Sequence, residues 1–169
     1  MRTNLYGEFV IEVEDYDAFL QSDLDRQRFI KIEPNLSTDH GVIINGSISK
    51  TGIYFIYKLI NEKNTPLYVG YTTSSIHQRI GRYFAAARGT QRIDENHPGG
   101  EKHKLELGLD FENMSMKFLH YDFSTLHDNI TPLDIEDWFI KKLQPIFNNQ
   151  NYINLKFEKE IKIINIKAA

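Results

Sequence analysis

Two tyrosine triplets and two nearby arginines are the parts of this sequence whose residue types could do chemistry. The triplet GIY occupies residues 52–54 and the triplet YVG occupies residues 68–70, and Arg79 and Arg82 follow shortly afterwards. A guanidinium carries permanently charged, planar donors that match a phosphate group. A tyrosine can act as a general base where its surroundings stabilise the phenolate. Taken one at a time, such tyrosines are more often half-buried hairpin residues, and such arginines are more often solvated.

The charge of the chain is unevenly distributed around these triplets. The net charge of -3 at pH 7 argues against binding of a polyanion over the whole surface. Residues 1–50 hold 5 Lys and Arg against 9 Asp and Glu, whereas residues 71–104 hold 6 Lys and Arg against 3 Asp and Glu. A local basic patch of this kind suits a phosphate-bearing ligand, although a solvated helix face would give the same count.

Length and composition fit one soluble domain. The 169 residues suffice for a single core, and the absence of Cys excludes disulfides, thiolate zinc sites and cysteine nucleophiles. No apolar run has the length of a membrane span, and the first residues lack the layout of a secretory signal. We therefore expect a cytoplasmic protein with no membrane partner.

The elements that position the triplets can be predicted from hydrophobic periodicity and from cap residues. Helices are expected at residues 13–32, 72–87 and 131–143, the last with Thr131 as N-cap and Pro132 at its first position. Strands are expected at residues 6–13, 41–60 with a turn near 45–47, 67–71, 114–123 and 153–167. Turn residues at 61–66 join the two triplet strands into a hairpin, and residues 88–104 are expected to form a polar loop. The fold class is α/β (α+β), with a small mixed or antiparallel sheet flanked by helices.

The two triplets resemble the signature of the GIY-YIG nuclease superfamily. The segment from Tyr68 to Phe84 is especially similar to the nuclease domain that opens the bacterial nucleotide-excision-repair incision subunit. In that domain an arginine follows the second triplet, and a tyrosine follows the arginine by four residues, as Tyr83 follows Arg79. Downstream, EDWFIKKLQPIFN resembles the last signature of the family, whose members fall here on Glu136, Ile140, Pro145 and Asn148. The resemblance covers about residues 50–150.

The resemblance implies hydrolysis of DNA phosphodiester bonds with one Mg²⁺ or Mn²⁺ ion per active site. Its expected catalytic residues are Tyr54, Tyr68, Arg79, Tyr83, Glu136 and Asn148. A single carboxylate such as Glu136 can hold one hard divalent ion, with waters and a phosphate oxygen in the remaining positions. Arg79 would bind the phosphate, and Tyr54 or Tyr68 would act as general base. Which of the two tyrosines does so is left open by the sequence.

Contacts to DNA are expected from the neighbourhood of the triplets and from the polar loop. The expected residues are Tyr71, Thr72, His77, Arg82, Arg88, Arg92, Lys102 and Lys104. Within the loop, His97, Glu101 and His103 could suggest a metal site. Because the chain has no Cys and the two histidines lack helical metal-site spacing, a flexible basic loop that touches DNA is the better interpretation.

Several roles fit these expectations. A stand-alone restriction-type endonuclease is preferred, and a homodimer would supply two active sites for two strands. Repair, phage, mobile-element or toxin nucleases would use the same chemistry, and a catalytically inactive scaffold that binds nucleic acid is the alternative from another class. We expect one structural domain with an accessory segment at residues 1–50, a nuclease core at 51–150 and a C-terminal extension at 151–169.

Overall fold

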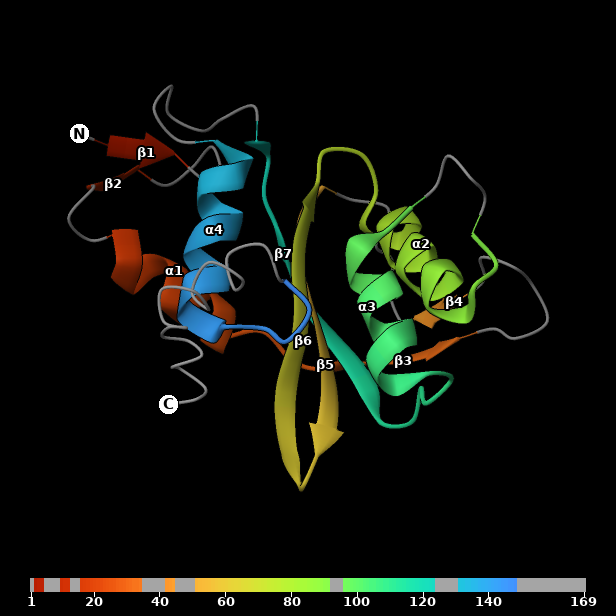
Figure 1. Ribbon diagram of the computed structural model, residues 1–169. Helices are drawn as coiled ribbons and strands as arrows, with labels where there is room; N and C mark the ends of the chain where they lie inside the picture. Colours follow the sequence, from red (N-terminus) through yellow and green to blue (C-terminus); the bar gives the residue numbers. More distant parts are fainter. Residues whose placement is uncertain are drawn as a thin grey trace, which may run out of the picture.

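A computed structural model of the chain describes residues 2–4, 10–12, 16–34, 42–44, 51–91, 96–123 and 131–148. Within these ranges the main element is a five-stranded antiparallel sheet with the strand order β4-β3-β7-β5-β6 (Figure 1). Its strands are β3 (Ile30–Pro34), β4 (Val42–Ile44), β5 (Gly52–Ile60), β6 (Lys63–Thr72) and β7 (Met114–His120). A separate antiparallel pair consists of β1 (Arg2–Asn4) and β2 (Val10–Glu12). The expected α+β class is confirmed.

Helices cover both faces of the sheet. The helices of the described ranges are α1 (Tyr16–Asp25), α2 (Ile76–Arg88), α3 (Pro98–Leu107) and α4 (Pro132–Leu143). Figure 1 shows α2 and α3 on one side of β5 and β6, with α1 and α4 on the other side. None of these helices has the length and apolar character that a membrane span requires.

The strand β5, which lies between β7 and β6, is buried on both faces, which explains its run of large apolar residues. Tyr54 and Ile56 face the α2–α3 layer, whereas Ile53, Phe55 and Tyr57 face the α1–α4 layer. Because side chains alternate along a strand, a strand with helices on both faces needs apolar residues at every position. The strand therefore joins the two hydrophobic cores of the molecule.

The hairpin that carries both triplets turns more tightly than expected. Its two turn residues, Asn61 and Glu62, both have positive φ angles of 50° and 63°. Two such residues match the twist of the flanking strands, as in type I′ hairpins. The strand resumes at Lys63, so most of the turn expected at 61–66 belongs to β6. Pro66 is tolerated there because β6 lies at the sheet edge, where a missing N–H costs little.

Three further expectations differ from the structure or fall outside it. The expected helix at residues 13–32 ends at Asp25, and its last residues belong to β3. The reason is tertiary pairing, because Ile30 pairs with Met116 of β7 and Ile32 is buried in the core. The strand expected at 153–167 and the turn near 45–47 lie outside the described residues. The N-cap at Thr131, the first-turn Pro132 and the end of α4 before Pro145 are confirmed.

Candidate active site

The free edge of β6 is the place where the expected site residues converge. Among the described strands β6 pairs with β5 alone, so the backbone groups of its alternate residues face away from the sheet. The backbone of Tyr71 donates a hydrogen bond to Glu136 of α4, and the backbone of Val69 pairs with the side chain of Asn148. Side chains of α4 and of the segment that follows it therefore reach this edge.

A cleft of about 460 Å³ lies beside this edge. Its lining comes from the end of β6, the turn that follows, α2 and α4. The lining residues are Tyr68, Gly70, Tyr71, Thr72, Thr73, Ser74, Arg79, Arg82 and Glu136. Three of the expected catalytic side chains, Tyr68, Arg79 and Glu136, thus share one cleft although they are far apart in sequence.

The two triplet tyrosines occupy different positions around this cleft. Tyr68 lines it and is partly buried, whereas Tyr54 is fully buried behind it, with 6.1 Å between their ring centroids. A Cβ atom on Gly70 would lie 2.5 Å from the Tyr54 hydroxyl, so only glycine admits the phenol beneath the cleft floor. Burial raises the pKa of Tyr68 to about 12 and that of Tyr54 still further above its usual range.

Arg79 links the buried phenol to the open cleft. It lies in the first half of α2, which begins where Ser75 Oγ accepts a hydrogen bond from the Gln78 N–H. Its guanidinium donates to Tyr54, which lowers the pKa of that phenol against the effect of burial. Among the described residues its buried Nε has no hydrogen-bond partner. A buried, unpaired donor on a cation at a cleft wall fits an anionic oxygen of a ligand.

Glu136 is the carboxylate that faces this arginine across the cleft. The pKa of Glu136 is raised to about 7, first by burial and then by the neighbouring Asp137, against the lowering effects of the Tyr71 N–H and Arg79. A carboxylate that is costly to charge in the free protein is stabilised by a bound cation.

The donor set around Glu136 decides which ion would fit. In the described ranges no group of three or more His, Asp or Glu side chains could hold a metal together. One carboxylate suits Mg²⁺, which keeps several waters and takes phosphate oxygens as further ligands. The residues present therefore fit a divalent ion held by Glu136 alone.

The remaining two expected catalytic residues lie behind the cleft. Tyr83 is fully buried, and its hydroxyl is 2.9 Å from His103 Nδ1. Asn148 lies after α4, and its amide is bonded to the Val69 backbone. Neither lines the cleft, so both are placed to support the residues that do.

Residues 98–104 do not belong to the flexible loop that the sequence suggested for 88–104, and for them this expectation was wrong. Pro98–Leu107 form α3, with His97 as its N-cap, and both His97 and His103 are fully buried. Two glycines begin this helix because larger residues would not fit. A Cβ on Gly99 would lie 2.4 Å from the Tyr68 ring, and one on Gly100 would lie 2.2 Å from the Tyr83 carbonyl. Tertiary packing here outweighs the poor helix propensity of glycine.

His97 is a residue of this site that the sequence interpretation missed. Its Nε2 lies 2.9 Å from the Tyr54 hydroxyl, and its ring centroid lies 5.0 Å from that of Tyr68. A signal was available, because Pro98 at the first position, Glu101 in the first turn and Lys104 in the last turn are typical of a helix. The two glycines obscured it.

The residues expected to contact DNA do not form one group. Tyr71, Thr72 and Arg82 line the cleft, and His77 is exposed on α2. Arg88 ends α2, Lys102 and Lys104 belong to α3, and Arg92 lies outside the described residues.

Lys104 lies near the C-terminal end of α2, away from the cleft. A Cβ on Gly89, which caps the C-terminus of α2, would lie 3.0 Å from Lys104 Nζ. The cleft lies at the other end of α2, which is about 20 Å long for its 13 residues. Arg82 lines the cleft and precedes Arg88 by six residues, about 9 Å along the helix. Arg88 and Lys104 therefore lie about half a helix beyond the cleft, and a cation near the last turn also suits the helix dipole.

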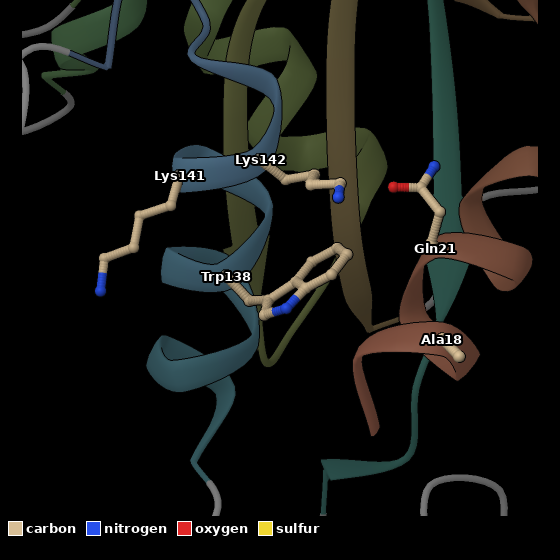
Figure 2. Close-up of a pocket in the computed structure, with 5 residues that line it drawn as sticks. All are labelled: Ala18, Gln21, Trp138, Lys141 and Lys142. Atoms are coloured by element: carbon tan, nitrogen blue, oxygen red, sulfur yellow. The ribbon is translucent and has the colours of Figure 1, made fainter. Parts of the chain in front are cut away.

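A second cavity of about 500 Å³ lies between α1 and α4 and is distinct from this cleft. It is lined by Ala18, Gln21, Trp138, Lys141 and Lys142. Figure 2 shows Trp138 and Lys142 from α4 directed toward α1, whereas Lys141 points away. Residues two apart on a helix do not share a face, so Trp138 and Glu136 serve different surfaces of α4.

Comparison with protein families gives one match, and it covers the residues that line the cleft. The model of the GIY-YIG catalytic domain matches residues 52–154, which include both triplets, Arg79, Glu136 and Asn148. No curated protein and no solved structure shows significant similarity to the chain.

Proposed function

The chain belongs to the GIY-YIG family of nucleases, and from this premise we propose that it is a divalent-metal-dependent endonuclease that hydrolyses DNA phosphodiester bonds. The observation that supports this proposal most directly is the shared cleft of Tyr68, Arg79 and Glu136. A phenol, a guanidinium and a carboxylate within one cleft supply a proton acceptor, a phosphate ligand and a cation ligand.

Each of these side chains would have one task in the reaction. Arg79 binds the scissile phosphate through donors that face the cleft and neutralises charge that develops on its oxygens. Glu136 holds a divalent cation, which when bound supplies positive charge at the phosphate and lowers the pKa of water. Tyr68 lines the cleft and Tyr54 does not, so Tyr68 is the better placed of the two phenols to take the proton of the attacking water.

The phenol must become more acidic for this task. Burial and Glu136 raise the pKa of Tyr68, whereas Arg79 lowers it. The positive charge of Arg79 thus stabilises the Tyr68 phenolate against the effects of burial and Glu136.

A restriction-type role is the finer part of the proposal. Such an enzyme needs surface for reading base edges, and the residues before position 52 lie outside the family match. We propose that residues 1–50 are an accessory segment within one structural domain with the core at 51–150 and an extension at 151–169. Leu20 and Leu24 of α1 and Phe139 of α4 belong to one hydrophobic cluster, which supports a single structural domain. A homodimer would cut both strands.

Digestion of supercoiled plasmid tests both levels of the proposal. The purified protein is incubated with and without Mg²⁺, beside Arg79→Ala and Glu136→Gln. The matched controls are Gln78→Ala, an exposed neighbour on α2, and Asp137→Asn, the adjacent carboxylate on α4. We expect cleavage only with metal, losses of about 100-fold or more in the two site variants, and much smaller effects in the controls.

The outcomes separate the possible roles. Discrete fragments support the restriction-type role, and a smear supports a repair, mobile-element or toxin nuclease that cuts without sequence preference. A protein that binds the plasmid but never cuts it would instead be a nucleic-acid scaffold. Equal activity of Arg79→Ala, Glu136→Gln and the wild type would contradict the assignment of the site.

A further inference from the structure

The first turns of α3 contact all three tyrosines of the site. His97 lies 2.9 Å from the Tyr54 hydroxyl, and Gly99 packs against the Tyr68 ring so closely that a Cβ has no room. His103 lies 2.9 Å from the Tyr83 hydroxyl. The helix α3 and its N-cap therefore help to set the positions of all three phenols. For each of its two histidines, the second hydrogen-bond partner shows which ring nitrogen carries the proton.

The proton of His97 can be assigned from its second partner. His97 Nδ1 accepts a hydrogen bond from the Gly100 N–H at 3.4 Å, as the N-cap of α3. A backbone N–H can only donate, so Nδ1 carries no proton and the neutral ring holds its proton on Nε2. His97 therefore donates to the oxygen of Tyr54 and does not accept the Tyr54 proton.

The proton of His103 is fixed in the same way but with the opposite effect on its tyrosine. His103 Nε2 lies 3.1 Å from the Asp110 carbonyl, which can only accept. The proton is again on Nε2, and Nδ1 must accept from the Tyr83 hydroxyl. Tyr83 therefore donates its hydroxyl proton to His103. Tyr54 accepts a hydrogen bond from His97 and does not donate its own proton to it.

The oxygen of Tyr54 receives two donors in this arrangement. One is His97 Nε2–H and the other is the guanidinium of Arg79. Hydrogen bonds to the charged form of a group favour that form. The hydroxyl lies beneath Gly70, at the floor of the cleft, so a proton that leaves Tyr54 leaves beside the substrate site.

We propose that His97 is a positioning residue of the nuclease site, which donates to the oxygen of Tyr54 and turns the proton of that phenol toward the cleft. This inference rests on the proposed nuclease function. Burial and the positive charge of Arg79 lower the pKa of His97 to about 3, which agrees with a ring that stays a neutral donor at working pH. The groups that face Tyr54 from the other elements are Tyr68 of β6, Arg79 and Tyr83 of α2, and Glu136 of α4.

Nitrogen-15 NMR of the imidazole rings tests the proton assignment without any substrate. In the metal-free protein at pH 7 we expect both His97 and His103 to be neutral rings with the proton on Nε2. His97→Asn and His103→Asn identify the two sets of signals by their loss. A His97 ring protonated on Nδ1, or charged at pH 7, would overturn the proposal whether or not the protein cuts DNA.

Two substitutions of His97 separate its role in catalysis from its role in the fold. Asn is a good N-cap, so His97→Asn keeps the acceptor for Gly100 but is too short to reach Tyr54. Gln extends further and can place an N–H near the former Nε2, although it caps the helix less well. We expect His97→Asn to lower kcat about 10- to 100-fold with little change in KM. We also expect His97→Gln to recover part of the lost kcat.

Asn96→Ala is the control for these substitutions, and three results would count against the proposals. Asn96→Ala changes the exposed neighbour of His97 and should leave both kinetics and melting temperature near wild type. Wild-type kcat in His97→Asn would overturn the positioning role. Activity that follows thermal stability across the variants, with His97→Gln no better than His97→Asn, would show a role in folding alone and would also overturn it. If the wild type itself cuts no DNA, the proposed function fails and the NMR result alone decides the hydrogen-bond direction.

Discussion

The side-chain amide of Asn148 pairs with both polar backbone groups of Val69. Its Oδ1 accepts from the Val69 N–H at 2.7 Å, and its Nδ2 donates to the Val69 carbonyl at 2.7 Å. Val69 lies on the edge strand β6 between Tyr68 and Gly70, which both line the cleft. The amide therefore makes the hydrogen bonds that a neighbouring strand would make. It fixes the part of β6 that carries Tyr68 and that covers Tyr54 through Gly70.

Replacement of Asn148 by Ala should weaken both the fold and the reaction. Two hydrogen bonds to a partly buried backbone are lost, so we expect the free energy of unfolding to fall by about 1–3 kcal/mol. Because the edge near Tyr68 gains freedom, kcat should fall by more than the unfolded fraction explains. Denaturant unfolding and plasmid cleavage measure the two effects.

The control for this substitution is Asn64→Ala, at an exposed position of the same strand. It should change neither quantity beyond about 0.5 kcal/mol or twofold. An Asn148→Ala variant with wild-type stability and activity would show that the edge of β6 is held by other contacts.

Substitution of Gly99 by Ala tests whether α3 holds the Tyr68 ring. The added Cβ would lie 2.4 Å from that ring, so either the helix or the phenol must move. We expect a loss of about 1–3 kcal/mol of stability and a lower kcat, whereas Ala should otherwise suit a helix better than Gly. Glu101→Ala, at an exposed position of α3, is the matched control. A more stable and fully active Gly99→Ala protein would contradict the packing of α3 on Tyr68.

The elements with strong local signals could be predicted from the sequence. Thr131 as N-cap and Pro132 at the first position predicted the start of α4, and hydrophobic periodicity predicted a helix at 72–87, where the structure has α2. Tyr68, Arg79 and Glu136 were all expected at the site, and the structure places them in one cleft.

The elements that depend on distant contacts could not be predicted in the same way. The strand β3 follows α1 closely and exists because Ile30 and Lys31 pair with β7, far along the chain. The helix α3 contains two glycines that are favourable only because Tyr68 and the Tyr83 carbonyl lie against them. The separation of the two tyrosines into one that lines the cleft and one that is buried depends on Gly70 and α3, which no local pattern reveals.

Substitution of Glu136 by Gln should stabilise the metal-free protein while it abolishes cleavage. The pKa of the Glu136 carboxyl is raised to about 7 from an ordinary value of 4.5. Its ionisation therefore costs folding free energy, and this cost appears as pH rises from about 4.5 through 7. At pH 8 in EDTA we expect Glu136→Gln to be about 1–3 kcal/mol more stable than the wild type, with little difference at pH 4.

Asp137→Asn provides the control for this prediction. Asp137 raises the pKa of Glu136, so its removal should give a smaller stabilisation in the same direction. Urea unfolding at the two pH values measures both variants. Glu136→Gln with the same or lower stability than wild type at pH 8 would show that the free carboxylate is well solvated or paired.

The two buried histidines should make the protein sensitive to acid. Burial lowers the pKa of His97 to about 3 and that of His103 to about 4, from an ordinary value of 6.5. In the unfolded chain both rings take up protons below pH 6.5, whereas the folded protein keeps them neutral. The stability that is present above pH 6.5 is therefore lost as pH falls toward these lower values, by about 2 kcal/mol for each ring at pH 5.

The slope of stability against pH distinguishes this effect from protonation of carboxylates. Between pH 5.5 and 4 the unfolded state binds nearly one more proton at His97 than the folded state does, so this residue contributes about 1.4 kcal/mol per pH unit. His97→Asn removes that contribution and keeps the helix cap, so its slope should be smaller than that of the wild type by about this amount. The comparison does not depend on any constant loss of stability in the variant, because a constant loss shifts the curve and leaves its slope unchanged. Equal slopes for the two proteins would mean that His97 gains its proton in the folded state, and the donor role of its ring toward Tyr54 would then have to be abandoned.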